Sequence, residues 1–404
     1  MGNSRQSKLR RIAWVAPLPL KNYLTRISKK GEFAHAAPWI TALMESIDKA
    51  AEIELDVFVP NTNEDDGTQQ YGIRTHLHSV RLQRYRGNPL LALLENGTKI
   101  SNAVASAKPD VVVVFGTEHI WSGALRDFFD APVIYRLQGN LNECLRWDKT
   151  HVNLSLPQRL LTEYLALNER RIFKLGRHFI VQTPWDHAIV RRFNSRAQCY
   201  YEVCLPRTEY LINTVEESAS APRRRSTVVC VGNTTERKGI AELLETIALV
   251  RRELADVRFL VFGRLQSWVH EKYSRTIQAL GESVQFYGSV GPSELIRELD
   301  TCTCFFNPTW IESYGMTNVE AQLRGAPLIS SFTGGVPYLV EHRVDGLLCE
   351  PGRTDQYAQA ILETLRDESA ARRRACTARV RALQRHHGKT AAERHIANCR
   401  AALG

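Results

Sequence analysis

The chain has 404 residues, enough for two domains of ordinary size, and its 44% hydrophobic and 24% charged content is that of a folded soluble protein. No apolar run in the sequence approaches the roughly 20 residues that a membrane-spanning helix needs. The net charge of +10 suits anionic ligands, although a solvated basic surface accounts for it equally well. Nine scattered cysteines without paired zinc spacing argue against a metal site or a disulfide framework.

The first half alternates short β-rich runs with amphipathic helical patterns, which is typical of parallel α/β sheets. We expect strands at 11–16, 53–59, 111–115, 133–136 and 179–182. Helices are expected between them, for example at 36–50 and 156–175. The charged N-terminus is not followed by an apolar signal segment, so we expect a cytoplasmic protein.

Polar side chains follow two of these strands. Glu118 and His119 come directly after strand 111–115, and Gln138 and Asn140 come after strand 133–136. Ligands of such sheets bind at the carboxyl ends of the strands, so we expect these residues to face a cleft between two domains. His119 could then contact a transferred sugar or position an acceptor hydroxyl, with Glu118 contributing. A single histidine at a strand end is more often structural.

A basic segment lies close to the N-terminus. Residues 21–31 carry four lysines and arginines, and more precede them. These charges could bind a phospholipid-linked acceptor or an anionic membrane, but a solvated loop accounts for them slightly better. We expect no nucleic-acid partner, because the aromatic residues lie mainly in apolar strands and not among Lys and Arg residues.

The polar, proline-containing segment 215–226 predicts a linker between a domain of residues 1–214 and a domain of residues 227–385. Strands of the second domain are expected at 227–231, 258–262, 284–287, 302–306, 328–330 and 346–349. Helices are expected at 239–254, 268–280, 292–299, 319–324 and 355–366, followed by a helical tail at 371–403. This alternation predicts a doubly wound parallel sheet.

Two glycine-containing loops of the second domain could approach a ligand. Strand 227–231 ends at Gly232, and Lys238 lies just before the next helix. A glycine turn followed by a cation at a helix start can bind a diphosphate, and Arg237 could assist. Taken alone, Lys238 is more simply an exposed lysine. Gly334 and Gly335 would let backbone amides approach a ligand, or would only allow a tight turn.

The most informative stretch is 312–320, in which Glu312 and Glu320 stand eight positions apart. It joins a buried strand to a helix, so Glu312 is expected in the loop and Glu320 about one turn into the helix. Four residues at the start of the helix lie between them: Tyr314, Gly315, Met316 and Thr317. The free amides there could hold a phosphate while the carboxylates bind hydroxyls. This combination suits a sugar nucleotide.

Together these residues resemble family 4 of the retaining glycosyltransferases, whose GT-B fold has two Rossmann-like domains facing a central cleft. Four motifs carry the resemblance, in order along the chain. Residues 231–239 resemble the phosphate loop, 284–290 the base-side strand and turn, 312–320 the E-x7-E motif, and 333–351 the closing signature. The first half is similar only in strand order, as expected of an acceptor-binding domain.

The resemblance implies roles for particular residues. Glu320 would bind the ribose hydroxyls, Glu312 the hydroxyls of the sugar ring, and Lys238 the diphosphate. Further contacts to the donor would come from the phosphate loop, the base-side turn and the helix start: Gly232, Asn233, Arg237, Val290, Tyr314, Gly315, Met316 and Thr317. The C-terminal helix, 386–404, would pack back on the first domain.

Two positions depart from the pattern of the family. Members usually carry an arginine where this chain has Asn233, and Arg237 could compensate. Many members carry a histidine where this chain has Gln138, and His119 could take over part of that role. The resemblance still implies activity, with the donor preference left open.

The implied reaction moves a sugar from a nucleotide diphosphate to an acceptor hydroxyl with retention, using neither a cofactor nor a metal. The implied setting is cell-surface polysaccharide or glycolipid synthesis, with a lipid-linked or oligosaccharide acceptor and peripheral association with the inner membrane face. The rivals are a sugar-nucleotide 2-epimerase or hydrolase on the same scaffold, a non-catalytic polyanion binder and an inactive scaffold. The sequence does not identify the sugar, the base, the acceptor or the linkage.

Overall fold

The computed structural model describes residues 9–18, 37–50, 52–83, 89–119, 121–125, 129–152, 155–211, 224 and 226–404. The basic segment 21–31 lies outside these residues, as does most of the expected linker 215–226. The chain forms two compact units. Unit 1 comprises Met1–Lys149, Asn153–Leu205 and His387–Gly404, and unit 2 comprises Thr150–Val152 and Pro206–His386.

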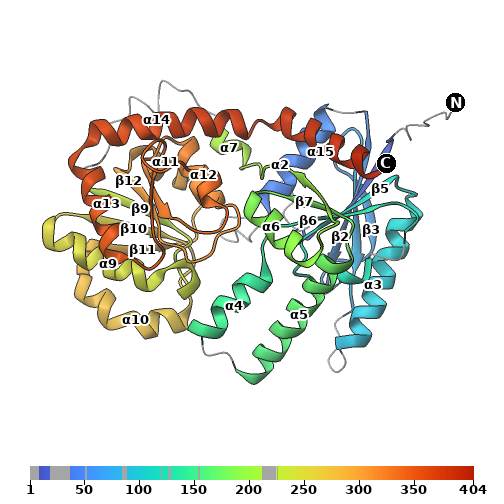
Figure 1. The fold of residues 1–404 in the computed structure, drawn as a ribbon, viewed down its shortest axis with the longest axis horizontal. Coiled ribbons are helices and arrows are strands. Elements are labelled where there is room, and N and C mark those ends of the chain that lie inside the picture. The colour runs from blue at the N-terminus through green and yellow to red at the C-terminus, as the bar shows by residue number, and fades with distance from the viewer. Residues whose placement is uncertain are drawn as a thin grey trace. The chain divides into compact units, whose positions relative to one another are not determined.

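Unit 1 is built on a sheet with the strand order β3-β4-β2-β1-β5-β6-β7-β8 (Figure 1). Its strands are β1 (Arg11–Val15), β2 (Glu54–Asn61), β3 (Gly67–Gln70), β4 (Thr75–Arg81), β5 (Val111–Phe115), β6 (Val133–Arg136), β7 (His178–Val181) and β8 (Gln198–Tyr201). All neighbouring strands are parallel except β3, which is antiparallel to β4. The structure confirms the five strands expected in this half. It adds β3, β4 and β8, which the sequence did not predict.

Helices cover both faces of this sheet. They are α2 (Pro38–Ala50), α3 (Pro89–Ser106), α4 (Leu141–His151), α5 (Leu156–Leu175), α6 (Pro184–Phe193) and α15 (Gly388–Ala402), with a 3₁₀ turn η1 (Ser122–Leu125). Alternate residues of β1 point to opposite faces. Trp14 belongs to the core beneath α2 and α15, whereas Val15 belongs to the core beneath α3, α5 and α6. The last helix of the chain is therefore part of unit 1.

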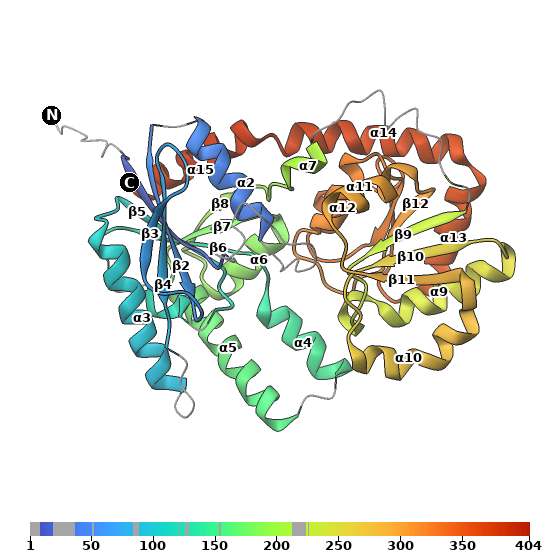
Figure 2. The same cartoon turned by 180° about the vertical axis from the view of Figure 1, so that it is seen from behind.

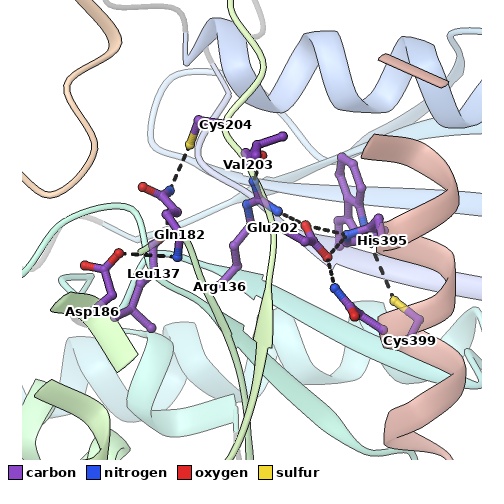
Figure 3. Close-up of polar contacts among 11 residues, drawn as sticks. Arg136, Leu137, Gln182, Asp186, Glu202, Val203, Cys204, His395 and Cys399 are labelled. Atoms are coloured by element: carbon purple, nitrogen blue, oxygen red, sulfur yellow. Dashed lines mark hydrogen bonds and ion pairs between the residues drawn. The ribbon is translucent and has the colours of Figure 1, made fainter. Parts of the chain in front are cut away.

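A buried polar cluster fastens α15 to unit 1 (Figure 3). His395 of α15 is fully buried, and its Nδ1 lies 3.0 Å from Oε1 of Glu202. Arg136, at the end of β6, forms an ion pair with the Glu202 carboxylate and donates to the Val203 carbonyl at 3.1 Å. Asn398 of α15 donates to the same carboxylate at 3.1 Å. One carboxylate after β8 thus holds two residues of the C-terminal helix.

The protonation of His395 follows from its two ring nitrogens. The Glu202 carboxylate favours a charged ring and raises the pKa of His395, although burial opposes the charge. The indole N–H of Trp14, however, can only donate, and it lies 3.1 Å from Nε2 of His395. A second proton on that nitrogen would bring two donors together, so the geometry favours the neutral ring with its proton on Nδ1. Arg136 and Glu202 then balance each other's charge.

Unit 2 is built on a second, entirely parallel sheet with the order β11-β10-β9-β12-β13-β14. Its strands are β9 (Thr227–Val231), β10 (Arg258–Phe262), β11 (Val284–Gly288), β12 (Cys304–Asn307), β13 (Leu328–Ser331) and β14 (Leu347–Cys349). All of the strands expected in this half are confirmed, with ends that shift by no more than a few residues. Apart from the partly exposed edge strand β11, they are mainly apolar runs buried on both faces, which is the usual character of central parallel strands.

The helices of unit 2 lie on both faces of its sheet, with α9 and α10 on one side and α11 and α12 on the other (Figures 1 and 2). The α-helices are α7 (Thr208–Leu211), α9 (Ile240–Glu253), α10 (Ser267–Leu280), α11 (Pro292–Thr301), α12 (Met316–Leu323), α13 (Thr354–Arg366) and α14 (Glu368–Arg385). The 3₁₀ turns are η2 (Glu236–Lys238), η3 (Gly281–Ser283) and η4 (Val336–Tyr338). None of the helices in the described part of the chain has the length and apolar character needed to cross a bilayer.

The strand order of unit 2 reverses between β9 and β12. The chain moves outward from β9 through β10 to β11, then returns to β12 on the other side of β9. The loops that follow β9 and β12 therefore leave in opposite directions and open a crevice at their carboxyl ends, where ligands of such sheets bind. Both loops carry candidate residues, so the topology brings the two motifs together.

Candidate active site

The loop after β9 is shaped by two glycines. Gly232 and Gly239 have φ values of +76° and +80°, a backbone conformation that disfavours side chains. A Cβ on Gly239 would lie 2.0 Å from the carbonyl oxygen of Pro308, whereas a Cβ on Gly232 would meet no atom within 4 Å. The loop is therefore closely packed at its end and open at its start, where a ligand can approach the backbone.

Asn233 holds this loop from the inside. Its side chain is fully buried, and Nδ2 donates to the carbonyl of Lys238 at 2.7 Å and to Oδ1 of Asn307 at 3.1 Å. Asn307 donates in turn to Oδ1 of Asn318 at 2.8 Å. These amides join the ends of β9 and β12 to α12. Oδ1 of Asn233 is buried without a partner among the described residues, so the residue shapes the loop and leaves one acceptor unused.

Lys238 and Glu312 form an ion pair across the crevice, with Nζ 2.6 Å from Oε2. Both side chains keep part of their surface exposed, 34% for Lys238 and 17% for Glu312. The backbone of Glu312 is held by the glycine pair after β13, since the Gly335 amide donates to its carbonyl at 2.9 Å. A Cβ on Gly334 would lie 2.0 Å from that same oxygen. The paired glycines thus support Glu312, a contact that the sequence did not predict.

The start of α12 offers backbone donors beside Glu312. Gly315 is the N-cap in a left-handed conformation, with φ +84°, and no side chain caps the helix. The amides of Met316 and Thr317 have no acceptor among the described residues. They lie at the positive end of the helix dipole, which favours an anion. These amides and the Lys238 ammonium could act on the same negatively charged group.

Tyr314 is directed away from this opening and into unit 2. Its side chain is 3% exposed, and its hydroxyl lies 2.8 Å from Nε2 of His386. His386 Nδ1 faces the carbonyl of Ala382 at 2.8 Å and must carry the proton, so Nε2 accepts from the tyrosine hydroxyl. Burial lowers the pKa of His386 to about 4, which keeps this ring neutral. The contact anchors the Glu312 loop to the end of α14.

Glu320 lies on α12, in a region of low solvation. No hydrogen bond reaches its carboxylate from the part of the chain that the structure describes. Burial raises its pKa to about 8, and the charge of Arg207, which precedes α7, opposes the increase only in part. A carboxyl group to which no described residue donates, and whose pKa is near neutral, is available to bind hydroxyl groups of a ligand.

The remaining candidates of unit 2, Arg237 and Val290, lie in the loops after β9 and β11. Arg237 is partly buried, and its carbonyl accepts from the Trp310 amide at 3.0 Å, which ties the phosphate loop to the loop after β12. Val290 is partly exposed in the turn after β11. The roles implied for these residues in donor binding stay predictions.

In unit 1, Glu118 and His119 lie side by side in the loop after β5. Nε2 of His119 is 3.8 Å from Oε1 of Glu118, and the imidazole stacks on Trp121 with ring centroids 4.9 Å apart. Burial lowers the pKa of His119 to about 4 and raises that of Glu118. His119 is therefore neutral at physiological pH, and it can exchange hydrogen bonds with a hydroxyl without carrying charge.

Gln138 and Asn140 follow β6. Nε2 of Gln138 and Nδ2 of Asn140 are both buried without a partner in the described residues. Buried amide groups rarely stay unpaired, so both are candidates to bind an acceptor. These two residues, with Glu118 and His119, belong to unit 1, whereas the candidates from Gly232 to Glu320 belong to unit 2.

Sequence reasoning missed Glu169 of α5, which organises both loops of unit 1. It is fully buried and accepts from Thr117 Oγ1 at 2.8 Å and from the Asn142 amide at 2.8 Å. Its carboxylate thereby links the loop after β5 to the start of α4. An acidic residue on the apolar face of α5, beside Ala166 and Ile172, was the signal that could have revealed it.

Two family models match this chain. Residues 225–367 match the model described as glycosyl transferases group 1, and residues 38–200 match the glycosyl transferase 4-like domain. The chain belongs to the group 1 glycosyltransferases. The residues from Gly232 to Glu320 lie inside the first match of this glycosyltransferase, and those from Glu118 to Asn140 lie inside the second.

Individual relatives match shorter stretches of this glycosyltransferase. A GDP-mannose-dependent α-(1-6)-phosphatidylinositol monomannoside mannosyltransferase of Mycobacterium tuberculosis is 28% identical over 160 residues, 36% of this chain and 40% of that protein. An amylovoran biosynthesis glycosyltransferase of Erwinia amylovora is 24% identical over 148 residues, 35% of this chain and 36% of that protein. The match thus spans about two fifths of the length of these relatives, or less.

Solved structures match this glycosyltransferase over nearly its whole length. A sucrose-phosphate synthase from Thermosynechococcus elongatus superposes with a TM-score of 0.75 at 19% identity, covering 96% of this chain and 98% of that one. HepE from Anabaena, in complex with UDP-glucose, superposes with a TM-score of 0.66 at 17% identity, with the same coverage. The likeness confirms the GT-B fold that the sequence resemblance implied.

Proposed function

We propose that this protein is a retaining glycosyltransferase that moves a sugar from a nucleotide-diphosphate donor to an acceptor hydroxyl. The observation that carries the proposal is the Lys238–Glu312 pair beside the acceptor-free amides of Met316 and Thr317. A sugar nucleotide has an anionic diphosphate between two sets of hydroxyls. This crevice has cationic and N–H groups beside carboxylates, which is the complementary arrangement.

Each side chain then has one task. Lys238 exchanges its contact with Glu312 for the diphosphate, Glu312 turns to the hydroxyls of the sugar ring, and Glu320 accepts from the ribose hydroxyls. The ion pair in the structure keeps Lys238 and Glu312 ordered and partly neutralised before a donor arrives. The hydrogen bond from Asn233 Nδ2 to the Lys238 carbonyl keeps the Lys238 backbone in place.

In the proposed reaction, the bond between sugar C1 and the β-phosphate oxygen breaks while the acceptor oxygen bonds to C1 from the same face. The acceptor proton passes to the departing phosphate, so the protein supplies no nucleophile. Negative charge grows on the diphosphate, where Lys238 and the α12 amides stabilise it. The proposed reaction needs no cofactor and no metal ion.

On the acceptor side, we assign hydrogen bonding to four residues of unit 1: Glu118, His119, Gln138 and Asn140. The unpaired amide nitrogens of Gln138 and Asn140 support this role, as does the neutral imidazole of His119. Gln138, Asn140 and the neutral His119 can each bind a hydroxyl without contributing a charge of their own. Glu169 acts through them, because it holds their two loops together.

The names of relatives and of solved complexes support a sugar nucleotide as donor and a cell-surface product. The Anabaena complex contains UDP-glucose, and the mycobacterial relative is named for GDP-mannose and a phosphatidylinositol mannoside. The Erwinia relative is named for amylovoran biosynthesis. We propose synthesis of a polysaccharide or glycolipid, in the cytoplasm or at the inner membrane face. All nine cysteines are thiols in the structure, which suits a reducing compartment.

The decisive experiment incubates the purified protein with UDP-, GDP- and ADP-sugars and candidate acceptors, and measures nucleotide release and the anomeric configuration of the product. We expect nucleotide release from donors that carry one particular base. The new linkage should have the same anomeric configuration as the sugar in the donor. Transfer with inversion would exclude the retaining mechanism. A C2-epimerised or free sugar would identify the epimerase or hydrolase, and no release with any donor would reject the proposal.

The same assay tests the site. Lys238→Ala removes the cation from the leaving group, and Glu320→Ala removes the ribose ligand, so each should lower nucleotide release by about 100-fold or more. Arg366→Ala is the matched control, because it breaks an exposed ion pair with Glu253 in the same unit. Wild-type rates in both site variants would refute the assignment.

A further inference from the structure

Helix α5 presents an apolar stripe to solvent. Leu156, Leu160 and Leu167 are 69%, 62% and 58% exposed, at spacings that place them on one face of a helix. The opposite face is buried, through Ala166, Glu169, Ile172 and Phe173. A surface helix usually turns polar residues outward, so three exposed leucines on one face mark a contact surface.

The first turns of α5 stand clear of the rest of unit 1. In Figures 1 and 2, α5 extends away from the sheet towards its connection with α4. Every residue from 155 to 161 is exposed. The helix is nevertheless well formed at this end, because Ser155 and Gln158 make a capping box. The leucines are therefore presented on an ordered helix.

Basic side chains continue the leucine stripe. Arg171 and Lys174 are exposed on the same face of α5, four and seven residues after Leu167. The acidic residues of α5 do not offset them: Glu163 pairs with Lys149 of α4, and Glu169 is fully buried. We define the outer face of α5 as Leu156, Leu160, Glu163, Leu167, Arg171 and Lys174. It is mainly apolar at one end and cationic at the other, and the Glu163 charge in its middle is balanced by Lys149.

We propose that the outer face of α5 docks the protein on an anionic membrane surface. The leucines would enter the boundary between headgroups and acyl chains, and Arg171 and Lys174 would contact lipid phosphates. A second copy of the chain fits this face less well. Parallel pairing would bring like charges together, and antiparallel pairing would set the leucines against the cations. A lipid interface accepts both kinds of group at once. The proposal does not depend on the transfer reaction.

Vesicle flotation tests this docking. The full-length protein should float with vesicles that contain phosphatidylglycerol and much less with phosphatidylcholine alone. The double change Leu160→Gln and Leu167→Gln should weaken binding by about tenfold or more, because two apolar side chains leave the interface. Arg171→Glu with Lys174→Glu should remove the preference for anionic lipid. Ile73→Gln is the control: it changes another exposed apolar residue of unit 1, 76% exposed, and should bind like the wild type.

Three outcomes would overturn the proposal. They are no binding of the wild type to anionic vesicles, unchanged binding of the leucine variant, and a leucine-dependent dimer in sedimentation that does not bind vesicles. Nucleotide release from a soluble acceptor assay should be unchanged in all α5 variants. Failure of docking and failure of the proposed transfer are therefore seen in separate measurements. Unchanged circular dichroism of the variants excludes unfolding as the cause.

Discussion

Asn233 illustrates how much one side chain contributes to the loop after β9. The side chain of Asn233 is fully buried and donates to the Lys238 carbonyl and to Oδ1 of Asn307. The positive charge of this loop therefore comes from Arg237 and Lys238, and buried amides give the loop its shape. At the residue scale, the partners of a side chain decide its role, and two further residues make this testable.

Glu320 should make donor binding depend on pH. Sugar hydroxyls donate to an ionised carboxylate, and burial raises the pKa of this carboxyl to about 8. Below that pH the group must first lose its proton, so donor affinity should rise about tenfold between pH 7 and the plateau above pH 8. Calorimetric titration with the donor identified in the release assay measures this. Glu320→Gln should bind weakly and without the pH dependence. A flat wild-type profile would contradict the assigned role.

Tyr314 should act by positioning the Glu312 loop. Tyr314→Phe leaves Nε2 of His386 buried without its donor, which costs about 1–3 kcal/mol of stability. Because the hydroxyl is directed into unit 2, we expect a loss of both stability and turnover, with donor affinity reduced through Glu312. Tyr338→Phe, at a tyrosine that is 53% exposed, is the matched control. Unchanged thermal unfolding of Tyr314→Phe would show that the hydrogen bond between Tyr314 and His386 contributes nothing to the free energy of unfolding.

At the scale of elements, the fit between two loops depends on the glycine that precedes α9. A Cβ on Gly239 would collide with the Pro308 carbonyl oxygen at 2.0 Å, in addition to straining a backbone with φ +80°. The loops after β9 and β12 can approach each other only because this position has no side chain. The same is true of Gly334 against Glu312.

Gly239→Ala should therefore destabilise unit 2 by about 1–3 kcal/mol or more and weaken donor binding, because Lys238 must move with the loop. Gly325→Ala is the control: its φ is also positive, +65°, but a Cβ there would come no closer than 3.9 Å to another atom. The control should show backbone strain alone. Urea unfolding of the two variants compares them, and equal losses of stability would mean that the Pro308 contact is unimportant.

At the scale of the whole molecule, the C-terminal helix α15 belongs to unit 1, and the carboxylate of Glu202 binds two of its side chains. Glu202 binds Arg136, His395 and Asn398, and all of these contacts join residues far apart in the sequence (Figure 3). Burial alone would raise the pKa of Glu202, but the charge of Arg136 and the hydrogen bonds from His395 and Asn398 lower it. Helix α15 is therefore attached by this buried polar cluster in addition to its apolar packing on unit 1.

Glu202→Gln should loosen α15, because it leaves the Arg136 charge buried and unpaired, at a cost of about 3–5 kcal/mol. Hydrogen exchange in His387–Gly404 should increase most. Glu143→Gln, which breaks the more exposed pair with Arg192 in the same unit, should cost less than about 1 kcal/mol. Unchanged hydrogen exchange in α15 would contradict the conclusion that Glu202 holds this helix in place.

The lowered pKa of Glu202 also determines in which direction its contribution to stability changes with pH. Its ionised form is stabilised in the folded state, so its contribution to stability is present above pH 4.5 and is lost as the pH falls towards 2. The stability difference between the wild type and Glu202→Gln should therefore shrink over that interval. Acid titration of both proteins, followed by circular dichroism, measures it.

The sequence by itself determined the strands of unit 2 and the placement of Glu312 in a loop and Glu320 on a helix. Buried parallel strands are continuous apolar runs, and a glycine or proline marks their ends, so local patterns suffice. Local patterns failed for β3, which is exposed along its length, and for β8 at the sheet edge. Neither strand has the apolar pattern of a buried one.

Only the tertiary structure decided which groups meet. The Lys238–Glu312 pair, the burial of Asn233, the Glu169 contacts and the fastening of α15 by Glu202 all join residues distant in the chain. Such contacts follow from the order of strands and the packing of helices, which no short stretch of sequence encodes. Desolvation likewise exists only once the chain has packed, so the pKa shifts of Glu320 and His119 could not be inferred from spacing.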